Sequence, residues 1–83
     1  MVIYMEEKLS SKEILRRNIK YYRKLNNITA EKLAEKLDLS HDFVRQVESE
    51  KIDKTFSVNS IEKVASVFNI EIMDLYNPDT ANK

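Results

Sequence analysis

Apolar residues recur along most of the chain at intervals of three and four positions, which is the period of an amphipathic helix. Short polar interruptions divide the pattern and predict five helices, at about residues 11–26, 30–37, 41–49, 57–68 and 71–76. The residues expected to face inward are Leu15, Ile19, Tyr22, Leu33, Ala34, Leu37, Phe43, Val44, Val47, Ile61, Val64, Ala65 and Phe68. The sequence therefore predicts an all-α fold.

Residues that favour helix ends stand at the predicted boundaries. Ser10 is followed three residues later by Glu13, so each side chain can accept a hydrogen bond from the other's backbone N–H. Thr29 and Ser40 are good N-caps for the second and third helices. Asn26 begins an asparagine pair that ends the first helix, because asparagine tolerates the left-handed conformation.

Composition narrows the class of protein. The 83 residues provide one core, and the absence of glycine, with Pro78 the single proline, argues against hairpins and sandwiches. There is no cysteine and one histidine, so we expect no disulfide, metal or cofactor. No apolar run suits a membrane span or a signal peptide, which predicts a soluble cytoplasmic protein. We expect an N-terminal arm (1–10), one domain (11–77) and a loose C-terminal tail (78–83).

The net charge is zero, with 14 basic and 14 acidic residues, but the charges are segregated. Residues 1–28 carry seven basic and three acidic groups, whereas residues 29–50 carry three and six. Two interpretations are equally good: a basic surface for an acidic partner, or helix faces that are simply solvated with mixed charge.

The second and third predicted helices are joined by about three residues. Ala34 is small enough to let them cross closely at a steep angle against Val44, and Leu39 in the turn fills the corner. Such a pair holds its second helix on the outside of the domain. There it can enter a DNA major groove, which is about 12 Å wide.

These landmarks resemble the phage-repressor or Cro-like helix-turn-helix proteins, also called the Xre family. The matching residues are Ile19, Lys20, Tyr21, Tyr22, Arg23, Ile28, Thr29, Leu33, Ala34, Leu39, Ser40, Val44, Val47, Glu48, Ile61, Val64, Ala65, Phe68 and Ile70. They extend over about residues 12–76. The resemblance implies a compact five-helix bundle, the lambda-repressor-like DNA-binding domain, acting as a two-fold-symmetric homodimer on double-stranded DNA.

The resemblance also implies that bases are read by outward residues near the start of the third helix, namely Ser40, His41, Asp42, Arg45 and Gln46. Gln46 would present a bidentate amide to adenine and Arg45 a fork to guanine, each worth about 1–3 kcal/mol of discrimination. Asp42 would accept from a cytosine amino group, or it stabilises the positive end of the helix dipole. His41 contacts DNA or is an exposed residue with no task; a lone histidine does not indicate catalysis.

Contacts to DNA phosphates are expected from Thr29, Lys32, Lys51 and Lys54. Each lysine is equally well explained as a solvated surface charge. Arg23 and Glu48 match positions that pair beneath the recognition helix in this family, so we assign both to structure. Removing one partner alone should be costly.

The chain departs from the family pattern at three positions. Ala30 stands where a phosphate-contacting glutamine is common, and Asp38 and Glu50 stand where glycine is common. The last two place a Cβ where positive φ is expected, at a cost of about 1 kcal/mol unless the backbone adjusts. We therefore expect modest affinity per half-site and a strong dependence on dimerisation.

Ile72, Leu75 and Tyr76 form a C-terminal apolar edge, which is either a dimer interface or ordinary core. For residues 2–5 of the arm three alternatives stay open: they pack across a partner, lie over the bundle or are disordered. The sequence thus predicts a transcriptional regulator, a repressor or controller protein with an inverted-repeat operator and no small-molecule ligand. The alternative is a protein-interaction module of the same fold, antitoxin-like or anti-repressor, which the zero net charge favours. An enzyme is not expected, because no nucleophile, base or metal ligands stand in motif spacing.

Overall fold

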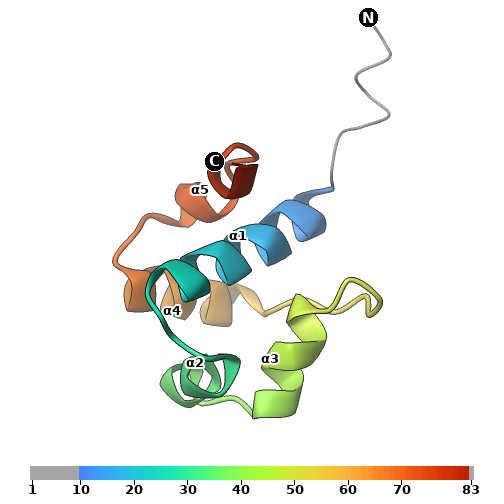
Figure 1. Cartoon of the computed structure of the whole chain (residues 1–83), viewed down its shortest axis with the longest axis vertical. Coiled ribbons are helices and arrows are strands. Elements are labelled where there is room, and N and C mark those ends of the chain that lie inside the picture. Colours follow the sequence, from blue (N-terminus) through green and yellow to red (C-terminus); the bar gives the residue numbers. More distant parts are fainter. Residues whose placement is uncertain (1–9, 83) are drawn as a thin grey trace, which may run out of the picture.

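The computed structural model describes residues 10–82, so the predicted arm lies almost wholly outside the described residues (Figure 1). The helices are α1 (Ser11–Leu25), α2 (Ala30–Leu37), α3 (His41–Glu48), α4 (Val58–Phe68) and α5 (Ile72–Leu75), followed by a 3-10 turn, η2 (Thr80–Asn82). The all-α prediction is confirmed, and each predicted helix boundary lies within one residue of the observed one. No helix among the described residues is long and apolar enough to cross a membrane.

Side-chain caps account for where the helices begin. Hydroxyl oxygens accept from backbone N–H groups at the starts of α1, α2, α3 and α4; the capping residues are Ser10, Thr29, Ser40 and Ser57. Each bond satisfies an N–H group that has no partner within its own helix. One predicted detail is wrong: the Glu13 carboxylate pairs with Arg16 instead of returning to the Ser10 backbone.

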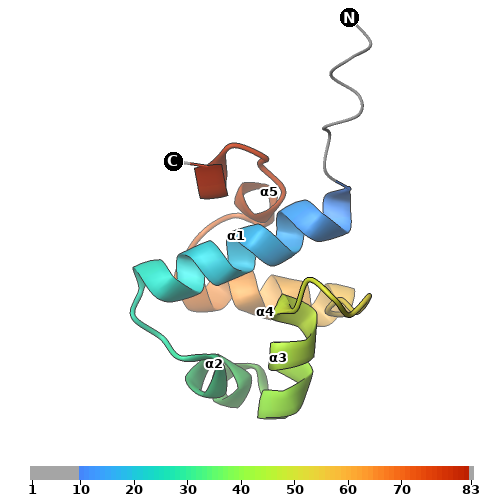
Figure 2. The same ribbon diagram turned by 45° about the vertical axis from the view of Figure 1, so that its right-hand side comes forward.

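Helix α1 runs through the middle of the molecule, with α5 and η2 on one side of it and α2 and α3 on the other (Figures 1 and 2). The core lies where these layers and α4 meet, and Ile19, Leu33 and Val44 are fully buried in it. Phe56 is also buried, although it comes from the irregular segment before α4, where no periodicity marked it as core. Its ring centroid is 5.8 Å from that of Phe43 on α3. The buried Phe56 side chain thereby holds the connection between α3 and α4 against the core.

The C-terminal segment is held against α1, so the prediction of a loose tail is wrong for residues 80–82. Asn18 is 1% exposed, and its amide nitrogen donates to the carbonyl oxygens of Leu75 and Asn77, both at 2.8 Å. Thr80 is buried, and its hydroxyl donates to the carbonyl of Asp74 at 3.4 Å. Buried polar groups with partners of this kind fix the path of the segment they bind.

The two glycine-to-acid departures have different outcomes. Asp38 caps α2 in the left-handed conformation, with φ 60° and ψ 41°, as the sequence predicts. Glu50 is not among the positive-φ residues. Helix α3 ends on Ser49 with φ −80° and ψ 134°, so the backbone turns away one residue earlier and avoids the strained conformation. The expectation of positive φ at Glu50 is wrong.

Candidate nucleic-acid interface

Helices α2 and α3 pack directly against each other through a small residue. Ala34 is 2% exposed, Val44 is fully buried and α2 packs against α3, which agrees with the close crossing that the sequence predicts. The left-handed Asp38 donates to the carbonyls of Ala34 and Glu35, and Leu39 donates to Ala34 O at 2.9 Å. Because the turn is fixed by backbone bonds, α3 has one defined direction relative to α2.

An ion pair between α1 and α3 lies beneath the outer face of α3. Arg23 donates from Nε to Glu48 Oε2 at 2.7 Å and from Nη2 to Oε1 at 2.9 Å. Its third bond, from Nη1, goes to the carbonyl of Ile28 at 2.9 Å. The side chains of Arg23 and Glu48 are only 12% and 8% exposed. This bidentate pair therefore ties α1, the α1–α2 connection and α3 together.

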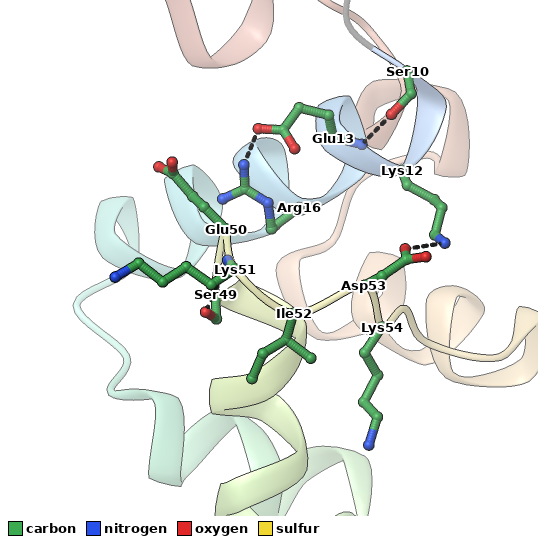
Figure 3. Close-up of a pocket in the computed structure, with 10 residues that line it drawn as sticks. All are labelled: Ser10, Lys12, Glu13, Arg16, Ser49, Glu50, Lys51, Ile52, Asp53 and Lys54. Atoms are coloured by element: carbon green, nitrogen blue, oxygen red, sulfur yellow. Dashed lines mark hydrogen bonds and ion pairs between the residues drawn. The ribbon is translucent and has the colours of Figure 1, made fainter.

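A second set of charges closes the cleft between the start of α1 and the segment after α3 (Figure 3). Arg16 is buried, pairs with Glu13 and donates to Glu48 O at 3.5 Å. Lys12 pairs with Asp53 across the cleft mouth. Arg16 is not among the residues that periodicity predicts to face inward, and its burial is compensated by its bonds to Glu13 and to the Glu48 carbonyl. These four charged side chains pair with one another and so help to hold the start of α1 against the segment after α3.

The outer face of α3 carries the residues expected to read bases. His41 is exposed, and the side chains of Arg45 and Asp42 are 65% and 80% exposed. Arg45 Nη1 lies 3.4 Å from Asp42 Oδ1, an exposed pair one turn apart. Gln46 is half-buried, and Ser40 is exposed with its hydroxyl accepting from Phe43 N at 3.1 Å. All five residues thus lie at the start or on the accessible side of α3.

The four expected phosphate contacts differ in how free they are. The Thr29 hydroxyl is occupied by the Lys32 N–H at 3.0 Å, and the Lys32 ammonium lies 3.3 Å from Glu35. Lys51 is exposed, and its ammonium has no ion-pair or hydrogen-bond partner among residues 10–82. Lys54 instead donates to Gln46 at 2.7 Å. Of the three lysines in this set, Lys51 is the one whose charge is most available to a new partner.

The helix-turn-helix family matches residues 19–75, which is most of the chain. The chain belongs to the phage-repressor-like helix-turn-helix family. It is 36% identical over 62 residues to an uncharacterized HTH-type transcriptional regulator of Methanocaldococcus jannaschii, a match that covers 75% of this chain and 91% of the relative. No solved structure gives a significant match.

Two lysines of this helix-turn-helix protein lie beside the outer face of α3, although the sequence did not predict a DNA contact for either of them. Lys20 and Lys24 line a cleft between α1 and α3 together with Ala30, His41 and Arg45. Neither lysine forms an ion pair within the described part of the chain. The sequence signal that could have found them is their spacing from Arg23: Lys24 follows it directly and Lys20 precedes it by three residues. Arg23 pairs with Glu48 and so fixes α3 against this side of α1.

The apolar edge of the helix-turn-helix protein is split between core and surface. Leu75 is fully buried, so its side chain is not available to a partner. Ile72 and Tyr76 are 39% and 38% exposed, and Met73 between them is 73% exposed. The predicted apolar edge did not include Met73, although its side chain is the most exposed of this group. Helix α5 and its C-cap Tyr76 thus present three apolar side chains to solvent, while Leu75 packs into the core.

Proposed function

We propose that this chain is a transcriptional regulator that binds double-stranded DNA sequence-specifically, as a homodimer on an inverted repeat, in the manner of a repressor or controller protein. The observation that carries the proposal is the position of α3. It is fixed from beneath by the Arg23–Glu48 pair, while His41 and Arg45 face solvent. A rigid helix with a free polar side is what insertion into the major groove requires.

Arg45 is the main base-reading residue in this proposal, directed at the O6 and N7 acceptors of guanine. Its contact with Asp42 is an exposed pair, and such pairs are worth only about 0.3–0.5 kcal/mol. The guanidinium is therefore easily exchanged from the carboxylate to a base. His41 and Asp42 stand beside it in the first turn of α3, where a groove-bound helix meets base edges.

Lys20 and Lys24 take the place of the missing glutamine as contacts to the DNA backbone. The glutamine position holds Ala30, whose small side chain leaves the cleft open toward α1. Both lysines carry a charge that no ion pair in the described chain neutralises. Lys51 would contribute from the other end of α3. A phosphate neutralised by each would make binding steeply dependent on salt.

A second copy of the chain is the proposed partner for the exposed apolar side of α5. Ile72, Met73 and Tyr76 lie within five consecutive positions, and Leu75 holds their backbone against the core. Two recognition helices related by a two-fold axis would then read half-sites about 34 Å apart. Sedimentation analysis of the native chain and of Met73→Glu tests this: we expect a dimer for the first and a monomer for the second.

Selection of bound duplexes from a random pool, followed by fluorescence anisotropy on the enriched site, tests DNA binding. We expect an enriched inverted repeat, and log K should fall linearly with log salt. Arg45→Ala should weaken binding roughly tenfold or more at the guanine positions. Lys63→Ala is the control, because Lys63 lines a cleft with α4 residues alone. A chain that enriches no site, or whose binding Arg45→Ala leaves unchanged, would refute the proposal.

A further inference from the structure

We propose that Lys54 is a positioning residue that fixes the amide of Gln46 and so makes this site read guanine instead of adenine. The inference rests on the proposed DNA-binding function. Lys54 Nζ donates to Gln46 Oε1 at 2.7 Å, although the two residues belong to different segments and are eight positions apart. The ammonium also lies 5.2 Å from the centroid of the Phe43 ring.

The Lys54 side chain is held in place by the core beneath it. A lysine ammonium over an aromatic face is attracted by the ring. The Phe43 ring in turn packs against Phe56, which is 3% exposed. Lys54 extends in the opposite direction from the carboxylate of its neighbour Asp53, which is paired with Lys12 (Figure 3). In the segment after α3, Asp53 thus binds a residue of α1 and Lys54 binds a residue of α3.

The chemistry of the contact determines how the amide is oriented. A lysine ammonium has three donors and no acceptor, so the amide must turn its oxygen toward Lys54. One lone pair of Oε1 is then taken by the ammonium, so the two N–H donors of Gln46 are the groups that remain wholly free for a base. The ammonium also places a positive charge beside Oε1, on the same accessible edge of α3.

This orientation reverses the expected base preference of Gln46. A free glutamine reads adenine with both amide atoms, because Oε1 accepts from N6 and Nε2 donates to N7. With Lys54 in place, the adenine N6 amino group would face the ammonium, donor against donor. Guanine presents acceptors at both N7 and O6, which attract the amide N–H groups and the ammonium alike. Gln46 and Lys54 together therefore read guanine.

Substitution of Lys54 would have a different effect if Lys54 contacted a phosphate, and this difference allows an experiment to distinguish the two roles. Loss of a phosphate contact weakens binding to all sequences alike and lowers the salt slope by about 0.9. Loss of a positioning residue changes the preferred base at one position of each half-site. Lys51 is the matched control, since it lies in the same segment and its ammonium has no partner within the described part of the chain.

The experiment compares the full chain with Lys54→Met, Lys54→Arg and Lys51→Met. For each, we would select sites from random duplexes and measure Kd on guanine and adenine versions of the operator. Lys54→Met should shift the ratio of the two Kd values toward adenine by roughly tenfold or more. Lys54→Arg, also a pure donor, should keep the guanine preference, and Lys51→Met should weaken both operators equally.

Two further measurements keep the inference falsifiable on its own. In a Gln46→Ala background, Lys54→Met should no longer change the base preference. In the DNA-free chain, the side-chain amide resonances of Gln46 should shift in Lys54→Met and stay in place in Lys51→Met. Equal weakening on both operators would make Lys54 a phosphate contact and overturn this inference while leaving DNA binding intact. Enrichment of no site by the native chain would overturn both.

Discussion

Arg23 and Glu48 form a nearly buried ion pair, and breaking it should destabilise the fold far more than replacing it. The Arg23 side chain is 12% exposed and has three hydrogen-bond acceptors. Glu48→Ala removes two of them and leaves only the carbonyl of Ile28. An uncompensated buried charge costs about 3–5 kcal/mol. A domain of this size has about 4–12 kcal/mol of stability in total, so the loss is about a quarter of it or more.

The reason for the large cost is desolvation, and a double substitution separates it from the value of the pair. Arg23→Met with Glu48→Leu removes both charges and keeps apolar volume beneath α3. Replacement of buried pairs in this way is often neutral, or stabilises by about 1–4 kcal/mol. We therefore expect the double variant to be within about 1 kcal/mol of the native chain or more stable than it, although each single variant is strongly destabilised.

Urea unfolding followed by circular dichroism at 222 nm measures the four free energies of this cycle. The single variants should also melt at least about 12 °C lower, since each kcal/mol corresponds to roughly 4–8 °C in a domain of this length. Glu35→Ala is the control: it breaks the exposed Lys32–Glu35 pair and should cost about 0.5 kcal/mol or less. If Glu48→Ala costs no more than Glu35→Ala, or if the double variant is as unstable as the two singles summed, the reasoning is wrong.

The five helices could be predicted from sequence because their determinants are local. Ser10, Thr29 and Ser40 cap the helices they precede, and apolar spacing marks their inner faces. The turn between α2 and α3 was equally legible, since Asp38 tolerates the left-handed conformation that the turn requires.

Contacts between distant residues could not be predicted in the same way. Asn18 reaches carbonyls 57 and 59 positions away, and nothing near it in sequence indicates those partners. Phe56 lies in an irregular segment with no period, so its burial depends on where that segment passes over Phe43. The Lys54–Gln46 bond depends on the same path. Periodicity therefore indicates which residues of α3 point outward, but it does not indicate that Gln46 meets Lys54.

Three further changes test separate parts of the structure. Ala34→Leu overfills the crossing of α2 and α3 and should cost about 1–3 kcal/mol in urea unfolding, with DNA affinity falling further than stability explains because α3 is displaced. Asn18→Ala removes two buried bonds and should cost about 1–3 kcal/mol, with faster amide exchange concentrated in residues 75–82; exchange that rises evenly through the chain would contradict it. Lys20→Met with Lys24→Met should lower the slope of log K against log salt by about two, while Lys63→Met leaves the slope unchanged.

The zero net charge of the chain is a poor guide to its surface, because two arginines of α1 turn inward while two of its lysines stay unpaired in the part of the chain that the structure describes. Arg16 and Arg23 turn inward, where a planar fork can satisfy Glu13 and Glu48 with several bonds at once. Those two carboxylates are thereby neutralised at short range. Lys20 and Lys24 keep compact, strongly hydrated charges that no ion pair in residues 10–82 offsets. Structural pairing thus neutralises Glu48 beneath α3 and leaves Lys20 and Lys24 of α1 without an ion pair in the described chain, so a neutral chain can still offer a local basic surface to a phosphate backbone.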